Sequence, residues 1–306
     1  MLSEALSAIA EIWDYCISAV KRIFVRKILV GVDEPNAGAE FAKWVVLCCY
    51  ELTPRPDLLG LLRAFKARNF GVVIASSNSS TRQYAELADL VVHVAPLGRD
   101  FTAYQQAFGH LDASDRLRDD GAIVFVNDSV WFFNKYHSEV VERIDEAVSQ
   151  GALVCGTMVV DEVPHVSGWL FGVPTTRELT AELQALFNRN FARRSRRHHI
   201  RKGEHQILPT LKSVRSVVSL DLPSTIPAVP QGYTAIMQGT QCYYVKADSS
   251  LRINNARSKM AAFLTTNSSG DETSEALRWL ARRSDILCRN RIRLKEMRWY
   301  SKTYFS

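Results

Sequence analysis

The chain has 306 residues, of which 47% are hydrophobic and 23% are charged, and its formal net charge is +6. This composition is typical of a globular protein and excludes disorder of the whole chain. The length suits one large α/β domain with additions, or two domains. The positive charge favours an anionic partner and leaves three classes open: a phosphate ligand, an anionic membrane surface and a nucleic acid.

The first 35 residues predict an amphipathic helix, because apolar residues recur at helical spacing and basic residues gather near the end of the segment. Two interpretations stay open. The helix could pack on the domain, or it could lie on an anionic membrane, since Trp13 and Phe24 with flanking basic residues suit that boundary. Charged residues interrupt the segment, so neither a secretory signal nor a membrane-spanning helix is predicted.

Short apolar runs alternate with amphipathic segments from residue 43 to residue 151. The pattern predicts strands at 44–50, 71–77, 90–96 and 121–129, and helices at 56–70, 80–88, 101–112 and 136–151. Strands that alternate with helices imply a parallel sheet covered on both faces. The predicted fold class is therefore α/β, with a doubly wound, mostly parallel sheet and flanking helices.

The rhythm changes after residue 152. Apolar runs at 153–163 and 165–175 could pair as neighbouring strands, and a helix is predicted at 176–191. A strongly basic run at 193–202 follows this helix. It suits a solvated helix continuation, a membrane-surface patch or a phosphate-binding loop.

The last hundred residues show a weaker pattern, with a Pro-rich stretch, a hairpin around residue 240 and an Arg-rich final helix. We therefore predict three parts: an N-terminal amphipathic helix over 1–35, a doubly wound α/β core over 36–212 and a C-terminal extension over 213–306.

The six cysteines are Cys16, Cys48, Cys49, Cys155, Cys242 and Cys288. There is no CxxC spacing, and no cluster of Cys and His has the spacing of a zinc site. Cysteine outside such patterns packs as a small hydrophobic residue. We therefore predict buried thiols and a reducing, cytoplasmic environment.

Polar residues follow the predicted strands at the places where ligands bind in open α/β sheets. They are Ser76, Asn78, Arg99, Asp100, Asn127 and Asp128. Such a cluster suits a nucleotide or sugar phosphate, together with a divalent metal. Structural roles are the alternative: Asp128 could cap a turn, and Arg99 and Asp100 could form a surface ion pair.

Several common active-site motifs are absent from the sequence. There is no Walker loop, no GxGxxG after the first predicted strand and no GxSxG elbow. These absences argue against a P-loop nucleotidase, a nicotinamide-binding Rossmann domain and a serine hydrolase of the α/β type.

Three stretches, "GRDFTAYQQAF", "AIVFVNDSV" and "GTMVVDEVPHVSGWLFGV", resemble the rhamnan synthesis protein F family of bacterial glycosyltransferases. The matching positions are Gly98, Asp100, Phe101, Tyr104, Asn127, Asp128, Ser129, Gly156, Thr157, His165 and Ser167. The resemblance covers roughly residues 43 to 210. Two departures are visible: the spacing in His-Val-Ser is one residue shorter, and "VWFFN" stands where the family has a Gly-Pro turn.

The resemblance implies a GT-A-like fold that binds a nucleotide-sugar donor and a glycan or lipid-linked acceptor. The acidic position of that fold falls on Asp128, which would approach Mg²⁺ or Mn²⁺ on the donor diphosphate. Asp100 would approach the nucleotide or sugar, and Arg99 and the basic run are candidates for stabilising the leaving diphosphate.

An inverting transfer also needs a base for the acceptor hydroxyl. Glu204 is the first candidate and Asp161 the second, with Glu162 beside it, and His165 would lie on the acceptor side. Each could instead be an ordinary surface or core residue.

The resemblance further implies surface polysaccharide synthesis in the cytoplasm, with peripheral contact to the inner face of the cell membrane as an additional expectation. A single carboxylate in Asn127-Asp128-Ser129, where Asp-x-Asp is usual, keeps open a non-catalytic sugar- or partner-binding module. A nucleic-acid partner is disfavoured, because no reader motif is present.

Overall fold

The computed structural model describes residues 29–36, 38–50, 55–77, 84, 86–94, 100–156, 158–159, 164–166, 168–190, 203–220, 233–238, 241–247, 270–280 and 282. The chain divides into two compact units. The first comprises Met1–Asp128 and Ser138–Asp221, and the second comprises Ser129–His137 and Leu222–Ser306. The three predicted domain ranges remain predictions.

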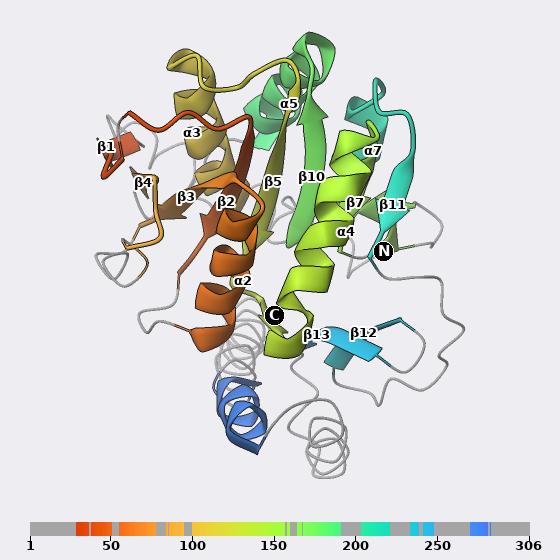
Figure 1. Ribbon diagram of the computed structural model, residues 1–306. Coiled ribbons are helices and arrows are strands. Elements are labelled where there is room, and N and C mark those ends of the chain that lie inside the picture. Colours follow the sequence, from red (N-terminus) through yellow and green to blue (C-terminus); the bar gives the residue numbers. More distant parts are fainter. Residues whose placement is uncertain are drawn as a thin grey trace, which may run out of the picture. The chain divides into compact units, whose positions relative to one another are not determined.

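An eight-stranded mixed sheet forms the centre of the first unit (Figure 1). In spatial order it contains β1 (Leu29–Asp33), β4 (Leu90–Val94), β3 (Phe70–Ser76), β2 (Lys43–Cys48), β5 (Gly121–Asn127), β10 (Leu170–Thr175), β7 (Leu153–Cys155) and β11 (Val217–Ser219). Strands β4, β3, β2 and β5 are parallel to one another. The antiparallel β10 separates β5 from β7, and β11 runs parallel to β7.

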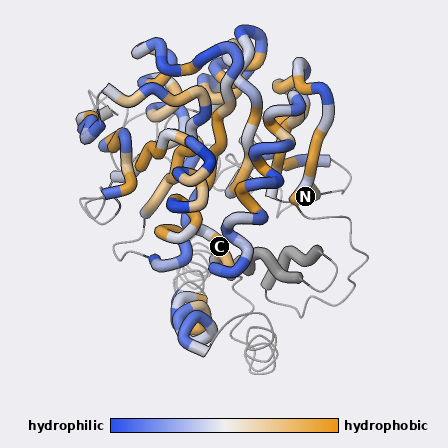
Figure 2. Tube along the Cα trace, viewed as in Figure 1, coloured by the Kyte–Doolittle hydropathy of each residue, from blue (hydrophilic) through white to orange (hydrophobic). Residues whose placement is uncertain are grey.

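Helices flank this sheet: α2 (Pro56–Ala67), α3 (Asp100–Ala113), α4 (His137–Ser149), α5 (Arg177–Asn190) and the short α7 (His205–Thr210). The predicted α/β class with a central parallel run and flanking helices is confirmed. Figure 2 shows hydrophobic colour along the central strands and hydrophilic segments on the helices. Parallel strands buried on both faces have this pattern.

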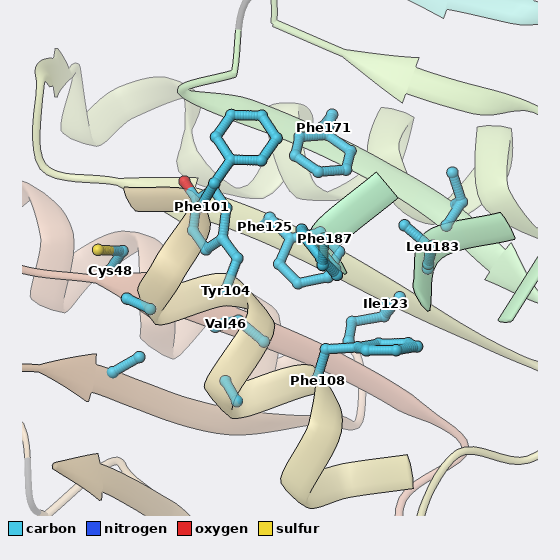
Figure 3. Packing of buried hydrophobic residues seen from close by; sticks show 14 of the residues in the cluster. Val46, Cys48, Phe101, Tyr104, Phe108, Ile123, Phe125, Phe171, Leu183 and Phe187 are labelled. Atoms are coloured by element: carbon cyan, nitrogen blue, oxygen red, sulfur yellow. The ribbon is translucent and has the colours of Figure 1, made fainter. Parts of the chain in front are cut away.

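Helices α3 and α5 pack on one face of the sheet through a core rich in aromatic rings (Figure 3). The rings of Phe125 and Phe171 stack with their centroids 4.9 Å apart, and Tyr104 lies 5.0 Å from Phe125. Phe187 of α5 packs edge-on against Phe125 at 5.3 Å. Aromatic pairs at these separations add about 0.5–1.5 kcal/mol each beyond the area that they bury. This core fixes the start of α3 against the strands that build the candidate site.

Ion pairs connect the elements of the opposite face. Lys43 of β2 pairs with Asp145 of α4 at 2.8 Å, and Arg68, directly after α2, pairs with Glu142 of α4. The sequence predicted α2 and α4 closely, at 56–70 and 136–151. Small differences at their ends are usual, because helix termini fray.

The edge strand β1 was not predicted, and it pairs antiparallel with β4. Polar contacts hold the segment that contains it: Glu34 accepts hydrogen bonds from His110 Nε2 at 3.2 Å and Arg116 Nη2 at 2.5 Å. Desolvation acts to raise the pKa of Glu34, but the hydrogen bonds and charges of Arg116 and His110 prevail and lower this pKa. An acid with a lowered folded-state pKa stabilises the fold at neutral pH.

We expect Glu34→Gln to lower the free energy of unfolding at pH 7 by about 1 kcal/mol, because a charge-assisted hydrogen bond is lost. The stabilisation by Glu34 is fully present above its ordinary pKa of 4.5 and disappears as the pH falls through the lowered folded-state pKa. Urea unfolding at a series of pH values measures this, and the variant and the wild type should converge in acid. A difference that persists unchanged in acid would show that the Glu34 charge has no part in it.

The second unit contains a three-stranded sheet in the order β12 (Tyr233–Gln238), β13 (Gln241–Ala247) and β6 (Val130–Phe132). The predicted hairpin near residue 240 is therefore present as β12 and β13. A helix spans 270–280, and its Trp279 ring lies 6.0 Å from Trp131. Glu272 accepts a hydrogen bond from the Asn134 amide at 2.7 Å. The "VWFFN" segment thus serves as part of this second unit.

Three cysteines whose side chains the structure describes, Cys48, Cys49 and Cys155, are buried, as predicted. Cys16 and Cys288 lie outside the described residues, and so does the predicted N-terminal helix. Among the residues that are described, no helix combines the length and apolar character needed to cross a bilayer.

Candidate functional site

The carboxyl ends of β2 and β5 meet the start of α3 at one rim of the sheet. Asn127, the last residue of β5, donates from Nδ2 to Asp100 Oδ2 at 2.6 Å. Its backbone amide donates to the Trp169 carbonyl, just before β10, at 2.9 Å. The structure thus brings together Asp100 and Asn127, which are separated by 27 residues in sequence. It also adds the segment before β10, which enters the same rim because β10 runs antiparallel to β5.

Asp128 lies next to this pair but is almost fully buried, with 1% of its surface exposed. Its Oδ2 accepts a hydrogen bond from the Tyr50 amide at 2.7 Å, and its own amide donates to the Cys48 carbonyl at 3.2 Å. Asp100, by contrast, is half-buried. Asp100 is therefore the more accessible carboxylate, and Asp128 fixes the chain that leaves β2.

A buried ion pair between Arg55 and Asp57, which was not predicted from the sequence, contacts the backbone of Asp128. Arg55 donates from Nη1 to the Asp128 carbonyl at 2.7 Å and from Nε to Asp57 Oδ1 at 3.0 Å. Its backbone amide donates to the hydroxyl of Tyr84 at 3.2 Å. The only available signal was an Arg and an Asp beside two prolines, in "PRPD", directly after a buried strand. Buried charges persist when they are paired and hydrogen-bonded, as here.

One thiol and two tyrosine hydroxyls at this rim have raised pKa values. Burial raises the pKa of the Cys48 thiol well above its ordinary value, and the neighbouring Asp100 and Asp128 raise it further. Burial raises the pKa of the Tyr50 and Tyr104 hydroxyls in the same way. All three groups therefore stay neutral at physiological pH and add no charge to this part of the rim.

Glu204, the first candidate base, lies at the start of α7 and is half-buried. Its Oε1 accepts a hydrogen bond from the Gly168 amide at 3.1 Å. Gly168 in turn packs on Phe101, the neighbour of Asp100, because a Cβ at Gly168 would lie only 2.8 Å from the Phe101 ring. Glu204 is therefore linked through Gly168 and Phe101 to the start of α3, although 104 positions separate it from Asp100 in sequence.

His165 of the short strand β9 (His165–Val166) stacks on His205, the first residue of α7. The two ring centroids are 4.2 Å apart, with the planes tilted by 34°. Both rings are half-buried. β9 pairs with β8 (Met158–Val159). His205 was not identified from the sequence, because a His beside a basic run gives no signal of its own.

The remaining predicted residues divide into two groups. Ser76 ends β3 and is 2% exposed, so it lies at the rim but within the packed interior. Asn78, Arg99, Asp161 and Glu162 lie outside the described residues, and so does the basic run at 193–202. Ser129 belongs to the second unit. All of these site assignments remain predictions.

The fit of a divalent metal to this rim depends on two carboxylates. Within the described part of the chain, no group of three or more His, Cys, Asp or Glu side chains is arranged to hold an ion. Mg²⁺, however, is commonly bound through one or two carboxylates together with substrate phosphates. Asp100 at the start of α3 and Asp128 directly after β5 supply carboxylate oxygens of the kind that this ligand set needs.

The fold and rim together define an α/β protein with a polar site at the carboxyl ends of parallel strands. No family model matches the chain, and no curated protein matches it. Solved structures to which part of this chain is similar include a mannose-1-phosphate geranyltransferase from Thermus thermophilus, with 13% identity and a TM-score of 0.35 over 58% of this chain and 74% of that chain.

Another is a 4-diphosphocytidyl-2C-methyl-D-erythritol synthase, with 8% identity and a TM-score of 0.33 over 59% of this chain and 90% of that chain. At these identities and TM-scores, the two matches support no argument about this chain.

Proposed function

We propose that the chain is a glycosyltransferase that moves a sugar from a nucleotide-sugar donor to a glycan or lipid-linked acceptor in bacterial surface polysaccharide synthesis. The observation that carries this proposal is the hydrogen bond between Asn127 and Asp100, which joins two predicted strand-end motifs at one rim. The motif resemblance to the rhamnan synthesis protein F family supplies the reaction class, and membership of that family is part of the proposal.

On the donor side, Asp100 is the ligand-facing carboxylate and Asn127 orients it through the hydrogen bond from Nδ2. Asp128 holds the Tyr50 amide and thereby shapes the loop that follows β2. A bound Mg²⁺ or Mn²⁺ would neutralise the charge that develops on the leaving diphosphate. Asp100 would hold that ion, the buried Asp128 would support it as the neighbouring carboxylate, and Arg99 remains a candidate for the same diphosphate.

On the acceptor side, Glu204 is the general base. One oxygen, Oε1, is bound to the Gly168 amide, whereas Oε2 makes no hydrogen bond with the described residues and so can receive a proton. The acceptor oxygen forms a bond to the anomeric carbon, its proton passes to Glu204, and the bond from that carbon to the diphosphate oxygen breaks. The diphosphate leaves with the electron pair, and the configuration of the sugar inverts.

The proposal is tested by incubating the full chain with a panel of UDP-, GDP- and dTDP-sugars, with and without Mn²⁺. The release of nucleoside diphosphate reports donor hydrolysis, with water as the acceptor. We expect at least one donor to be hydrolysed and the rate to rise with Mn²⁺. Calorimetry with the same donors separates binding from turnover.

Asp128→Asn tests the metal side without disturbing the loop, because an asparagine oxygen can still accept the Tyr50 amide. We expect the Mn²⁺-dependent rate to fall roughly 10- to 100-fold, as for residues that support a metal ligand. The exposed Asp119→Asn, which makes the same charge change, serves as the control. A variant with the wild-type rate would remove Asp128 from the mechanism.

A non-catalytic sugar- or partner-binding module is the second candidate. The burial of Asp128 favours it, because only Asp100 then offers an accessible carboxylate among the described residues on the donor side of this rim. This candidate predicts that calorimetry detects a nucleotide sugar while no diphosphate is released. Absence of binding by every donor in the panel would contradict both candidates.

A further inference from the structure

We infer that Tyr104 is a positioning residue for Glu204, and that it acts through the backbone of Gly168. The inference rests on the proposed function, since it assigns Glu204 the role of base. Tyr104 lies in α3, on the donor side of the rim, and Glu204 lies at the start of α7. The Gly168 segment connects the two.

Hydrogen bonds hold the Gly168 segment from two sides. The Tyr104 hydroxyl donates to the Gly168 carbonyl at 3.3 Å, and the Gly168 amide donates to Glu204 Oε1 at 3.1 Å. The next carbonyl, that of Trp169, accepts the Asn127 amide at 2.9 Å. A displacement of this segment would therefore move the carboxylate of Glu204 relative to Asp100 and Asn127.

Close packing against Phe101 restricts the position of the Gly168 segment. Gly168 and Gly203 both lie against the ring of Phe101, where a Cβ would come within 2.8 Å and 3.1 Å of ring atoms. Gly203 directly precedes Glu204, so its contact with Phe101 restrains the position of the backbone that carries the proposed base. A Cβ at Gly168 would force Phe101 to shift, and a Cβ at Gly203 would make a tight contact with the same ring.

Tyr104 is suited to a purely geometric role. Its side chain is fully buried, and its ring packs against Phe125 and Phe171. Burial raises the pKa of its hydroxyl well above the ordinary value, so the group stays protonated and acts as a donor rather than as a base. A rigid buried donor that fixes a backbone carbonyl positions the neighbouring site and takes no part in proton transfer.

The test is a double-mutant cycle with Tyr104→Phe and Glu204→Gln, using hydrolysis of the donor selected from the panel of UDP-, GDP- and dTDP-sugars. Tyr104→Phe removes one oxygen and retains the ring. We expect it to lower kcat about 10-fold with an unchanged KM for the donor, because a misplaced catalytic group loses rate and not donor affinity. In the Glu204→Gln background, the same change should have no further effect.

Hydrogen exchange at the Gly168–Leu170 amides provides a readout that needs no substrate. Tyr104→Phe should speed exchange of the Gly168 amide several-fold and leave the amides of β2 unchanged, because only the hydrogen bond to the Gly168 carbonyl is lost. Ser114→Ala is the control. It removes a hydroxyl-to-carbonyl hydrogen bond, to His110 O at 2.6 Å, at the other end of the same helix, and should change neither measurement.

The two failures are distinguishable. If no donor is turned over, or if Glu204→Gln is fully active, the proposed function fails, and exchange at Gly168 alone decides whether Tyr104 holds this segment. If Glu204→Gln is inactive but Tyr104→Phe has the wild-type kcat and wild-type exchange at Gly168, the inference is overturned and the proposed function stands. Additive losses in the cycle would also overturn it.

Discussion

Glu204→Gln should lower the kcat of donor hydrolysis by roughly 100- to 10,000-fold, the usual contribution of a general base. Glutamine is nearly isosteric and can still accept the Gly168 amide through its carbonyl oxygen, so the local structure should persist. It cannot take a proton from the acceptor. Since the proposed function has the donor bound on the Asp100 side of the rim, its KM should change little. Initial rates at saturating donor measure the effect.

A matched control is Glu178→Gln, an exposed glutamate in the first turn of α5. It makes the same chemical change away from the rim and should keep the wild-type rate. If Glu204→Gln retained the wild-type kcat while hydrolysis by the wild type was well measured, the base would have to be another group. Asp161 would then be the next candidate to substitute.

Gly121→Ala should destabilise the first unit by about 3 kcal/mol, the upper end of the usual cost of overpacking. Gly121 begins β5, and a Cβ there would lie 1.9 Å from the Ala42 carbonyl oxygen and 2.9 Å from Thr175 Oγ1. The Ala42 carbonyl cannot move away easily, because it accepts the Ala122 amide at 3.2 Å where β2 and β5 begin to pair. The added methyl group would therefore clash with backbone atoms where β2 and β5 pair.

Thermal unfolding should show a fall of the melting temperature by roughly 6–12 °C, since 1 kcal/mol corresponds to about 2–4 °C at this size. Gly109→Ala is the control with the opposite sign. Gly109 lies inside α3, and a Cβ there meets nothing within 4 Å. Alanine should stabilise that helix by about 1 kcal/mol. Equal melting temperatures for the two variants would contradict the tight packing at Gly121.

The regular alternation from residue 43 to residue 151 allowed most of the parallel sheet to be predicted, because each buried strand is a short apolar run. The helix predicted at 80–88 is not borne out at the residues of that range that the structure describes, where 84, 86 and 87 form turns. The predicted pairing of the runs at 153–163 and 165–175 is confirmed, because β7 and β10 pair as neighbouring antiparallel strands. The pairing of β10 with β5 could not be predicted, because pairing between segments that are distant in sequence leaves no local pattern. β1 was missed because the apolar residues of 29–33 continue those of the predicted N-terminal helix.

The meeting of Asp100 and Asn127 was predictable for a physical reason: carboxyl ends of parallel strands share one edge of the sheet. The burial of Asp128 was not, because whether an aspartate faces a ligand or a backbone amide depends on the path of the Tyr50 loop. The link from Tyr104 through Gly168 to Glu204 could not be predicted either. It depends on two glycines that pack against Phe101, and a glycine in sequence does not reveal what it approaches.

The rim formed by Asp100 and Asn127 is tested most directly by calorimetry of UDP and GDP, in the presence of Mn²⁺, with the wild type, Asp100→Asn and the exposed α3 variant Asp112→Asn. We predict that one nucleotide binds the wild type and Asp112→Asn equally, and that Asp100→Asn binds it roughly 10- to 100-fold more weakly, through loss of a charged contact. Equal affinity in all three proteins, or no binding by the wild type, would contradict a nucleotide site at this rim.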